Sequence, residues 1–78
     1  MATKAYILIE AAIGKTREVA DALTAVPGME NVDAVTGPYD IIATASAGDV
    51  NSVGRLVTDH IHPIPGIIKT VTCLSITG

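Results

Sequence analysis

Apolar residues change their spacing along this chain, and each change predicts a new secondary-structure element. Residues 5–12 form a short apolar run rich in β-forming residues, which predicts a buried strand broken by Gly14. From Lys15 onward the apolar positions recur every three or four residues, which is the period of an amphipathic helix. Pro27 and Gly28 end that helix, because proline cannot continue it and glycine frees the backbone to turn.

The middle of the chain predicts two strands joined by a turn. Residues 29–36 contain several polar side chains, so this strand is expected to expose one side or one end. Gly37 and Pro38 supply the turn. Residues 39–46 form the next strand, which is apolar on both faces at residues 41–43.

A second helix and a last strand complete the pattern. Asp49 is expected to cap the start of the helix, since its carboxylate can accept hydrogen bonds from otherwise unpaired backbone N–H groups. Gly54 lies within the helix, where glycine is less favourable than alanine by about 1 kcal/mol of helix stability. Its presence suggests a close approach of the helix to the sheet or to a neighbouring chain. Pro63 ends the helix, and residues 67–76 form the last strand.

The chain also contains an internal repeat. Val26-Pro27-Gly28-Met29 matches Ile64-Pro65-Gly66-Ile67, and each copy ends a helix and begins a strand. Two strand–helix–strand halves in one sheet predict an α+β, ferredoxin-like βαββαβ fold with a four-stranded antiparallel sheet. Right-handed crossovers place both helices on one face of that sheet. All 78 residues are expected to form a single domain.

The chain is more hydrophobic than a monomer of its size can hide. Hydrophobic residues make up 49% of it, whereas so small a domain buries only about 60% of its unfolded surface. No apolar run approaches the roughly 18–20 residues of a membrane-spanning helix. The first and last strands are apolar on both sides, so we expect a second copy to cover the open sheet face. The prediction is a face-to-face homodimer, a dimeric α+β barrel.

Charge and cysteine content argue against several other classes. The net charge is −3, and the five basic residues are scattered rather than gathered in a stripe, which argues against direct nucleic-acid binding. The single Cys73 cannot form an intrachain disulfide, and the first residues carry no signal-peptide pattern. We therefore expect a cytoplasmic protein.

No catalytic constellation is evident in the sequence. The serines and threonines lack a visible pairing with a histidine and a carboxylate. Asp59, His60 and His62 suggest a metal, but they lack CxxC or HExxH spacing. Histidines at a helix C-terminus are also favoured by the helix dipole. We expect neither a metal nor a cofactor.

The sharpest candidate for ligand binding is the turn segment Gly37, Pro38, Tyr39 and Asp40. Glycine before proline reaches conformations that leave backbone groups free for a ligand. The Asp40 carboxylate can accept hydrogen bonds from an ammonium group of the ligand. Tyr39 can pack against an apolar side chain of the ligand. A plain turn with a surface carboxylate is the alternative. Thr70 and Thr72 share one strand face, where they either offer hydroxyls to a ligand or are ordinary strand residues.

Several of these segments together resemble the effector-binding (RAM) domain of the Lrp/AsnC, or feast/famine, transcription regulators. The matching segments span nearly the whole chain and are Val26–Met29, Thr36–Ile42, Asp49 at a helix start, Ile64–Ile67 and Thr70–Thr72. The resemblance implies the same βαββαβ fold, dimers formed through the sheets, and higher oligomers that bind amino acids between dimers.

The same resemblance assigns the ligand contacts. It implies that Gly37, Tyr39 and Asp40 contact the ligand, and less directly Thr70 and Thr72, while Pro38 lies at the variable position of the family. Full regulators have an N-terminal helix-turn-helix domain, and this chain starts at its first strand. We therefore expect a stand-alone RAM module over residues 1–78 that acts on transcription through a DNA-binding homologue. A small dimeric ferredoxin-like enzyme of the monooxygenase kind and a pure assembly module remain alternatives.

Overall fold

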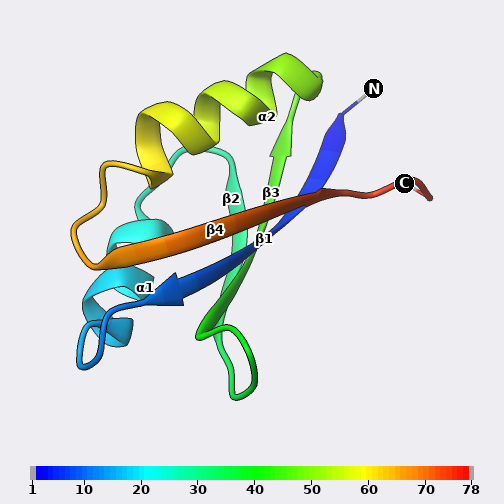
Figure 1. Cartoon of the computed structure of the whole chain (residues 1–78). Coiled ribbons are helices and arrows are strands. Elements are labelled where there is room, and N and C mark those ends of the chain that lie inside the picture. Colours follow the sequence, from blue (N-terminus) through cyan, green and yellow to red (C-terminus); the bar gives the residue numbers. More distant parts are fainter. Residues whose placement is uncertain (1, 78) are drawn as a thin grey trace.

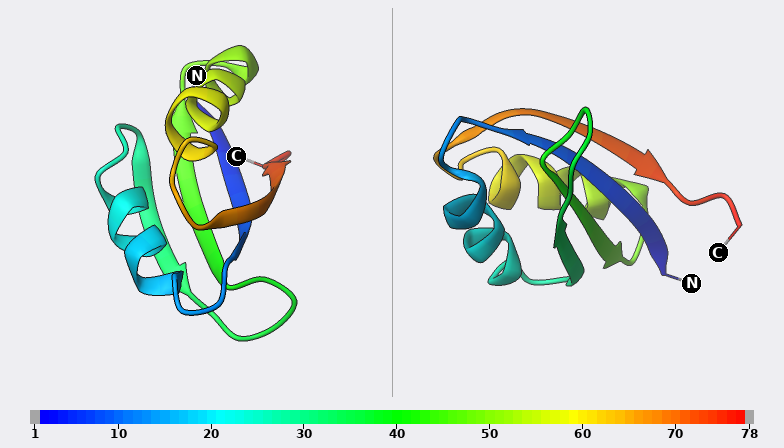
Figure 2. Two further views of the ribbon diagram at one scale, coloured as in Figure 1. Left: turned by 60° about the vertical axis from the view of Figure 1, so that its left-hand side comes forward. Right: turned by 90° about the horizontal axis from the view of Figure 1, so that it is seen from below.

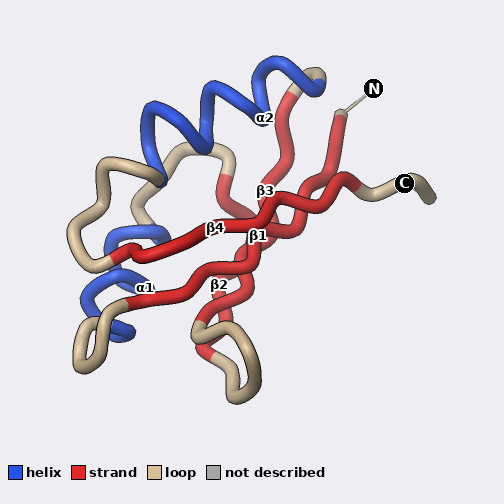
Figure 3. The backbone as a smooth tube through the Cα atoms, viewed as in Figure 1, coloured by secondary structure: helices blue, strands red, loops and turns tan. Residues whose placement is uncertain are grey.

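The computed structural model describes residues 2–77, which form one sheet covered on one side by helices. In chain order the elements are β1 (Thr3–Ala11), α1 (Thr16–Thr24), β2 (Met29–Ala34), β3 (Ile41–Ala47), α2 (Val50–Leu56), a π-helical segment (Val57–Ile61) that continues α2, and β4 (Ile67–Leu74). The strands are antiparallel in the order β2-β3-β1-β4. Both helices lie on one side of them (Figures 1, 2 and 3). The predicted ferredoxin-like βαββαβ fold is confirmed.

The core is a single layer between the helices and the sheet. β1 buries alternate residues, as a strand with one covered face does. Ala5, Ile7 and Ile9 have no exposed surface, and their partners in β3 are buried with them. The main core cluster consists of Ile7, Ile9, Ala11, Val19, Leu23, Ile41, Ala43, Ala45, Leu56, Val57 and Ile61.

The two Pro-Gly copies have matching structural roles. Gly28 and Gly66 both have positive φ angles, +87° and +99°, which favour glycine. A Cβ added to Gly28 would lie 3.2 Å from Leu56 Cδ1 of α2, and one added to Gly66 would lie 3.0 Å from Val19 Cγ2 of α1. Each glycine therefore packs against the helix of the other half, which explains why the repeat preserves it.

Two predictions about β2 and its connection were wrong in detail. β2 ends at Ala34 and β3 begins at Ile41, so residues 35–40 form a longer loop than the predicted two-residue turn. The register shifts between Met29 and Asn31, and both Met29 and Val32 pack against the core. A bulge adds one residue to a strand, which explains why Met29 and Val32 face the same side although strict alternation would place them on opposite faces.

In α2, the predicted cap at Asp49 is confirmed, whereas the predicted close approach at Gly54 is not. The Asp49 carboxylate accepts a hydrogen bond from the backbone N–H of Ser52 across 2.7 Å, so Asp49 caps the helix as expected. Gly54 is exposed, and no atom lies within 4 Å of a Cβ added there. The predicted close approach to the sheet was therefore wrong, because Gly54 lies on the solvent side of α2. Contact with a neighbouring chain stays a prediction.

The sheet face opposite the helices has an apolar centre. Ile42, Leu8 and Val71 are direct neighbours across three strands, and each is only half-buried. Tyr6, which is 38% exposed, and Cys73 pair in the adjacent row. Such a face suits a partner surface, and the predicted homodimer through the sheet stays a prediction. Over residues 2–77, no helix has the length and hydrophobicity needed to span a membrane.

Candidate ligand-binding site

The loop between β2 and β3 is anchored to β1 by Asp40. The carbonyl oxygen of Asp40 accepts a hydrogen bond from the Val35 N–H across 2.9 Å, which closes the base of the loop. The Asp40 N–H donates to the carbonyl oxygen of Ile9 across 2.9 Å. Its side-chain Oδ2 accepts from the backbone N–H of Ala11 across 2.8 Å. The β1–β4 register shifts between Glu10 and Ala11, so the carboxylate binds the strand where its pairing is irregular.

The tip of this loop is open to solvent. Thr36, Gly37 and Pro38 are exposed, whereas Tyr39 and Asp40 are half-buried. Gly37 has a φ angle of +136°, and a Cβ added there would meet no atom within 4 Å. The backbone conformation rather than a lack of space therefore calls for glycine. The loop projects from the end of the sheet opposite α2 (Figure 1).

The two candidate threonines lie apart from this loop within one chain. Thr70 pairs with Ile9, which pairs on its other side with Ile41 at the start of β3. Thr70 and Thr72 therefore lie on the helix side of the edge strand β4, separated from β3 by β1. Two inter-strand spacings amount to about 10 Å. The structure thus gathers the four loop residues at one end of β3 and leaves the threonines on another strand.

A histidine that the sequence linked to a metal or to the helix dipole is the partner of Thr70. His62 Nε2 lies 3.1 Å from Thr70 Oγ1, although both side chains are accessible to solvent. Among residues 2–77, no three or more His, Cys, Asp or Glu side chains are arranged to hold a metal ion. The position of His62 just after a helix did not reveal this contact, because the partner lies beyond the Pro65–Gly66 turn.

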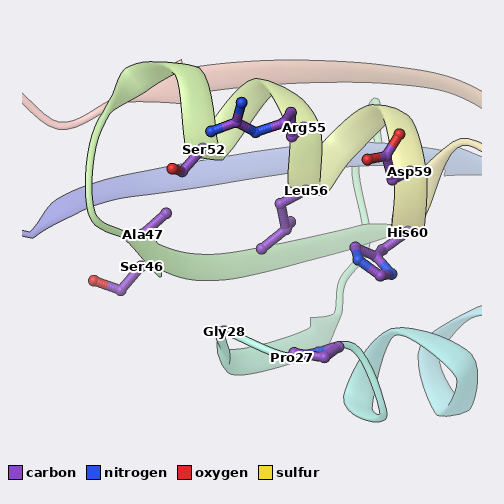
Figure 4. A pocket seen from close by; sticks show the side chains of 9 residues that line it. All are labelled: Pro27, Gly28, Ser46, Ala47, Ser52, Arg55, Leu56, Asp59 and His60. Carbon is purple, nitrogen blue, oxygen red and sulfur yellow. The ribbon is translucent and has the colours of Figure 1, made fainter.

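A separate groove lies at the other end of β3, and sequence reasoning missed it. It has a cavity volume of about 420 Å³ and is lined by Pro27, Gly28, Ser46, Ala47, Ser52, Arg55, Leu56, Asp59 and His60. Figure 4 shows Leu56 pointing between α2 and β3, with His60 directed toward the turn before β2. These residues come from three distant segments, and the sequence signals near them were the Pro27–Gly28 copy of the repeat and the neighbouring Asp59 and His60.

Hydrogen bonding tunes one carboxyl group near this groove. The pKa of Asp49 lies below its ordinary value, chiefly because the backbone N–H of Ser52 donates to the carboxylate. The Ser52 hydroxyl and the positive charge of Arg55 act in the same direction. The negatively charged form of Asp49 is therefore stabilised by its hydrogen bond at the start of α2.

Known proteins share this fold and part of this sequence. An uncharacterized HTH-type transcriptional regulator of Pyrococcus horikoshii, PH1916, is 36% identical over 78 residues, which cover 96% of this chain and 52% of the regulator. The chain therefore spans about half the length of the curated relatives it matches.

Solved structures extend the likeness. The crystal structure of FFRP-DM1 has a TM-score of 0.89 and 32% identity, covering 95% of this chain and 99% of that one. The transcriptional regulator NMB0573 of Neisseria meningitidis, solved as a complex with L-Met, has a TM-score of 0.85 and 21% identity, covering 95% of this chain and 49% of its own. Because the sequence identity to NMB0573 is only 21%, this similarity shows a shared fold and nothing further.

One family model accounts for nearly the whole chain. It is described as the Lrp/AsnC ligand binding domain, and it matches residues 4–77. The match includes both Pro-Gly copies, the loop at 35–40 and the two threonines of β4. This chain belongs to the Lrp/AsnC ligand binding domain family.

Proposed function

We propose that this chain is an oligomeric sensor module that binds a small molecule, an amino acid, between subunits. The observation that carries the proposal is the separation of the loop 37–40 from Thr70 and Thr72 within one chain. Ile9 lies between them and is fully buried under the helices, so a ligand cannot lie across it. A site that uses both groups therefore needs the loop of one subunit and the threonines of another.

The chemistry of the loop supports an amino acid as the ligand. Asp40 uses Oδ2 to hold Ala11, which leaves Oδ1 for an ammonium group. The exposed backbone around Gly37 offers N–H and C=O groups to the ligand. Tyr39 is half-buried and supplies an apolar wall. The L-Met bound by NMB0573, a protein of similar fold, supports the same ligand class.

We also propose that the module takes part in transcription regulation together with a partner. The curated relatives are HTH-type transcriptional regulators about twice as long as this chain. We infer that the module acts as a single ligand-binding domain and joins a DNA-binding homologue through the apolar sheet face. Ligand binding between subunits would then favour one assembly over another, because a ligand stabilises the state that binds it.

A thermal-shift screen tests the ligand. Each of the twenty common amino acids is added singly at millimolar concentration, and at least one should raise the melting temperature by mass action. Gly37→Ala should remove that rise, since the alanine disfavours the loop conformation, while Gly54→Ala on the solvent side of α2 should retain it. No shift with any amino acid would contradict the proposed ligand class.

The partner is tested separately. The chain is mixed with a purified DNA-binding homologue, and their co-elution in size-exclusion chromatography is measured with and without the amino acid found above. We expect a mixed assembly whose amount changes with the ligand. Strict self-assembly under both conditions would contradict regulation through a homologue.

A further inference from the structure

We propose that His62 is a positioning residue of the amino-acid site and that it acts through Thr70. Its Nε2–H donates to the Thr70 hydroxyl oxygen, and this bond leaves the Thr70 hydroxyl hydrogen for the carboxylate of the ligand. The role of His62 rests on the function proposed above, and it concerns the carboxylate half of that site.

The His62 side chain reaches Thr70 directly. Its Nε2 atom lies 3.1 Å from Thr70 Oγ1, which is within hydrogen-bonding distance. Thr70 is half-buried on the helix side of β4, whereas the next residue, Val71, pairs with Leu8 on the open side of the sheet. The contact therefore lies on the same side of β4 as Thr72, the second threonine of the proposed site.

The backbone that carries His62 is held at both ends. The His62 N–H donates to the Val57 carbonyl oxygen across 2.9 Å, which ties it to the helix before it. Further along the chain, the Ala12 N–H donates to the Gly66 carbonyl oxygen across 2.7 Å, which ties the connection to the end of β1. His62 therefore stands on a short connection that is anchored on both sides rather than at the tip of a free loop.

The π-helical segment Val57–Ile61 determines which way His62 faces. In an α-helix the N–H of residue 62 would bond to residue 58, whereas here it bonds to Val57, five residues back. The additional residue in the turn rotates the following side chain by about 100° relative to a continued α-helix. Figure 4 shows His60 directed toward the turn before β2, whereas His62 reaches β4. Such π-helical segments are rare, and they occur frequently at functional sites.

The contact controls what the Thr70 hydroxyl can offer to a ligand. A threonine hydroxyl has one hydrogen to donate and two lone pairs that accept. If His62 Nε2 carries a hydrogen, it donates to Thr70, and the Thr70 hydrogen remains for the ligand. If Nε2 carries none, Thr70 donates to His62 and offers the ligand only lone pairs. The hydrogen on His62 Nε2 thus decides whether Thr70 suits an anion or a cation.

The other half of the proposed site selects between these two forms. In the proposed function Asp40, from the loop of another subunit, takes the ammonium group, which leaves the carboxylate of the ligand for the threonines. A carboxylate only accepts hydrogen bonds, so Thr70 must donate to it and must accept from His62. The site therefore uses the Nε2–H form of His62.

Long-range ¹⁵N–¹H NMR correlations of the imidazole rings test the position of this hydrogen in the full chain. The sequence contains two histidines, so in His60→Gln the remaining ring signals belong to His62. At about pH 8, where histidine side chains are ordinarily neutral, we expect the Nε2–H form. The Nδ1–H form would overturn the proposal.

Calorimetric titration tests the link to the carboxylate. The probes are the common amino acid with the largest thermal shift in the screen above and its carboxamide, which lacks the carboxylate. His62→Ala should weaken binding of the amino acid about threefold to tenfold, the size of one neutral hydrogen bond. It should leave binding of the carboxamide unchanged. His62→Gln, whose side-chain amide can donate to Thr70, should restore most of the affinity, and His60→Gln should leave it unchanged.

A double-mutant cycle tests whether His62 acts through Thr70. Thr70→Val removes the hydroxyl, and adding His62→Ala to it should cause no further loss of affinity. A second loss of the same size would overturn the proposal, as would equal weakening of the amino acid and its carboxamide by His62→Ala. Undiminished binding by His62→Ala would overturn the role of His62 alone and leave the proposed function standing. If no amino acid shifts the melting temperature, the proposed function fails and the role of His62 fails with it.

Discussion

The carboxylate of Asp40 and the backbone N–H of Ala11 are joined by a hydrogen bond of 2.8 Å. This bond ties the loop between β2 and β3 to the end of β1. A carboxylate expected from the sequence to serve a ligand thus also holds its own loop in place. The two roles can be separated experimentally, because one depends on an acceptor oxygen and the other on negative charge.

Asparagine and alanine at position 40 distinguish these roles. Asp40→Ala leaves the Ala11 N–H without its partner and should lower the free energy of unfolding by about 1–2 kcal/mol. Asp40→Asn keeps an acceptor oxygen and should retain most of that stability, as measured by urea unfolding. If the charge also binds an ammonium group, Asp40→Asn should still weaken amino-acid binding.

Two outcomes would contradict this account of Asp40. Equal unfolding free energies for wild type and Asp40→Ala would show that the Ala11 bond contributes nothing. Undiminished amino-acid binding by Asp40→Asn would show that the negative charge is not used for the ligand.

Two glycines should respond to alanine in opposite directions. Gly37→Ala forces a side chain into a φ angle of +136° and should destabilise the protein by about 1–2 kcal/mol. Gly54→Ala adds a methyl group to an exposed helix position with no neighbour within 4 Å, and it should stabilise by about 1 kcal/mol. Thermal unfolding of both variants checks the pair, and a stabilised Gly37→Ala would contradict the role given to that backbone.

The proposed dimer depends on the apolar centre of the open sheet face. Leu8→Glu places a charge between Ile42 and Val71 and should convert the dimer to a monomer. Val50→Glu on α2, where the side chain is 56% exposed, should leave the dimer intact. Size-exclusion chromatography with light scattering measures both, and an unchanged Leu8→Glu dimer would exclude this face as the interface.

The cap at Asp49 predicts a pH dependence. Its folded-state pKa lies below the ordinary value of 3.8, so its carboxylate stabilises the fold above that pH. This contribution is lost as the pH falls through the folded-state pKa. Asp49→Ala should therefore lower the melting temperature by a few degrees at neutral pH.

The difference between wild type and Asp49→Ala should then shrink below about pH 3.8. Asp49→Asn keeps a capping oxygen at every pH and serves as the control. A constant difference between wild type and Asp49→Ala down to pH 2 would contradict the cap as its source.

The fold was predictable from the sequence because its strongest signals are periodic or repeated. Alternation in β1, helical spacing in α1 and the duplicated Pro-Gly pair each agree with the structure. Bulges carry no such signal, so alternation alone would place Met29 and Val32 on opposite faces, although both pack against the core. Tyr39 was placed in a strand because it follows the Gly-Pro pair, although the loop extends to Asp40.

The candidate sites were less accessible to sequence reasoning. The loop residues 37–40 are contiguous, so their cluster could be read directly. The groove instead combines Gly28, Ser46 and Arg55 from separate segments, and only the folded chain brings them together. The Asp40–Ala11 and His62–Thr70 bonds likewise depend on strand register, which hydrophobic spacing does not fix.

The sheet order has a consequence for how the chain folds. Every hydrogen-bonded strand pair, β2–β3, β3–β1 and β1–β4, joins one half of the repeat to the other. Within residues 2–77, neither half contains a strand pair of its own, and Gly28 and Gly66 each pack on the helix of the other half. Such halves cannot serve as independent folding units, so unfolding should be a single cooperative transition. Cutting the chain in the exposed loop at Gly37 should give two fragments that are disordered alone and fold only when mixed.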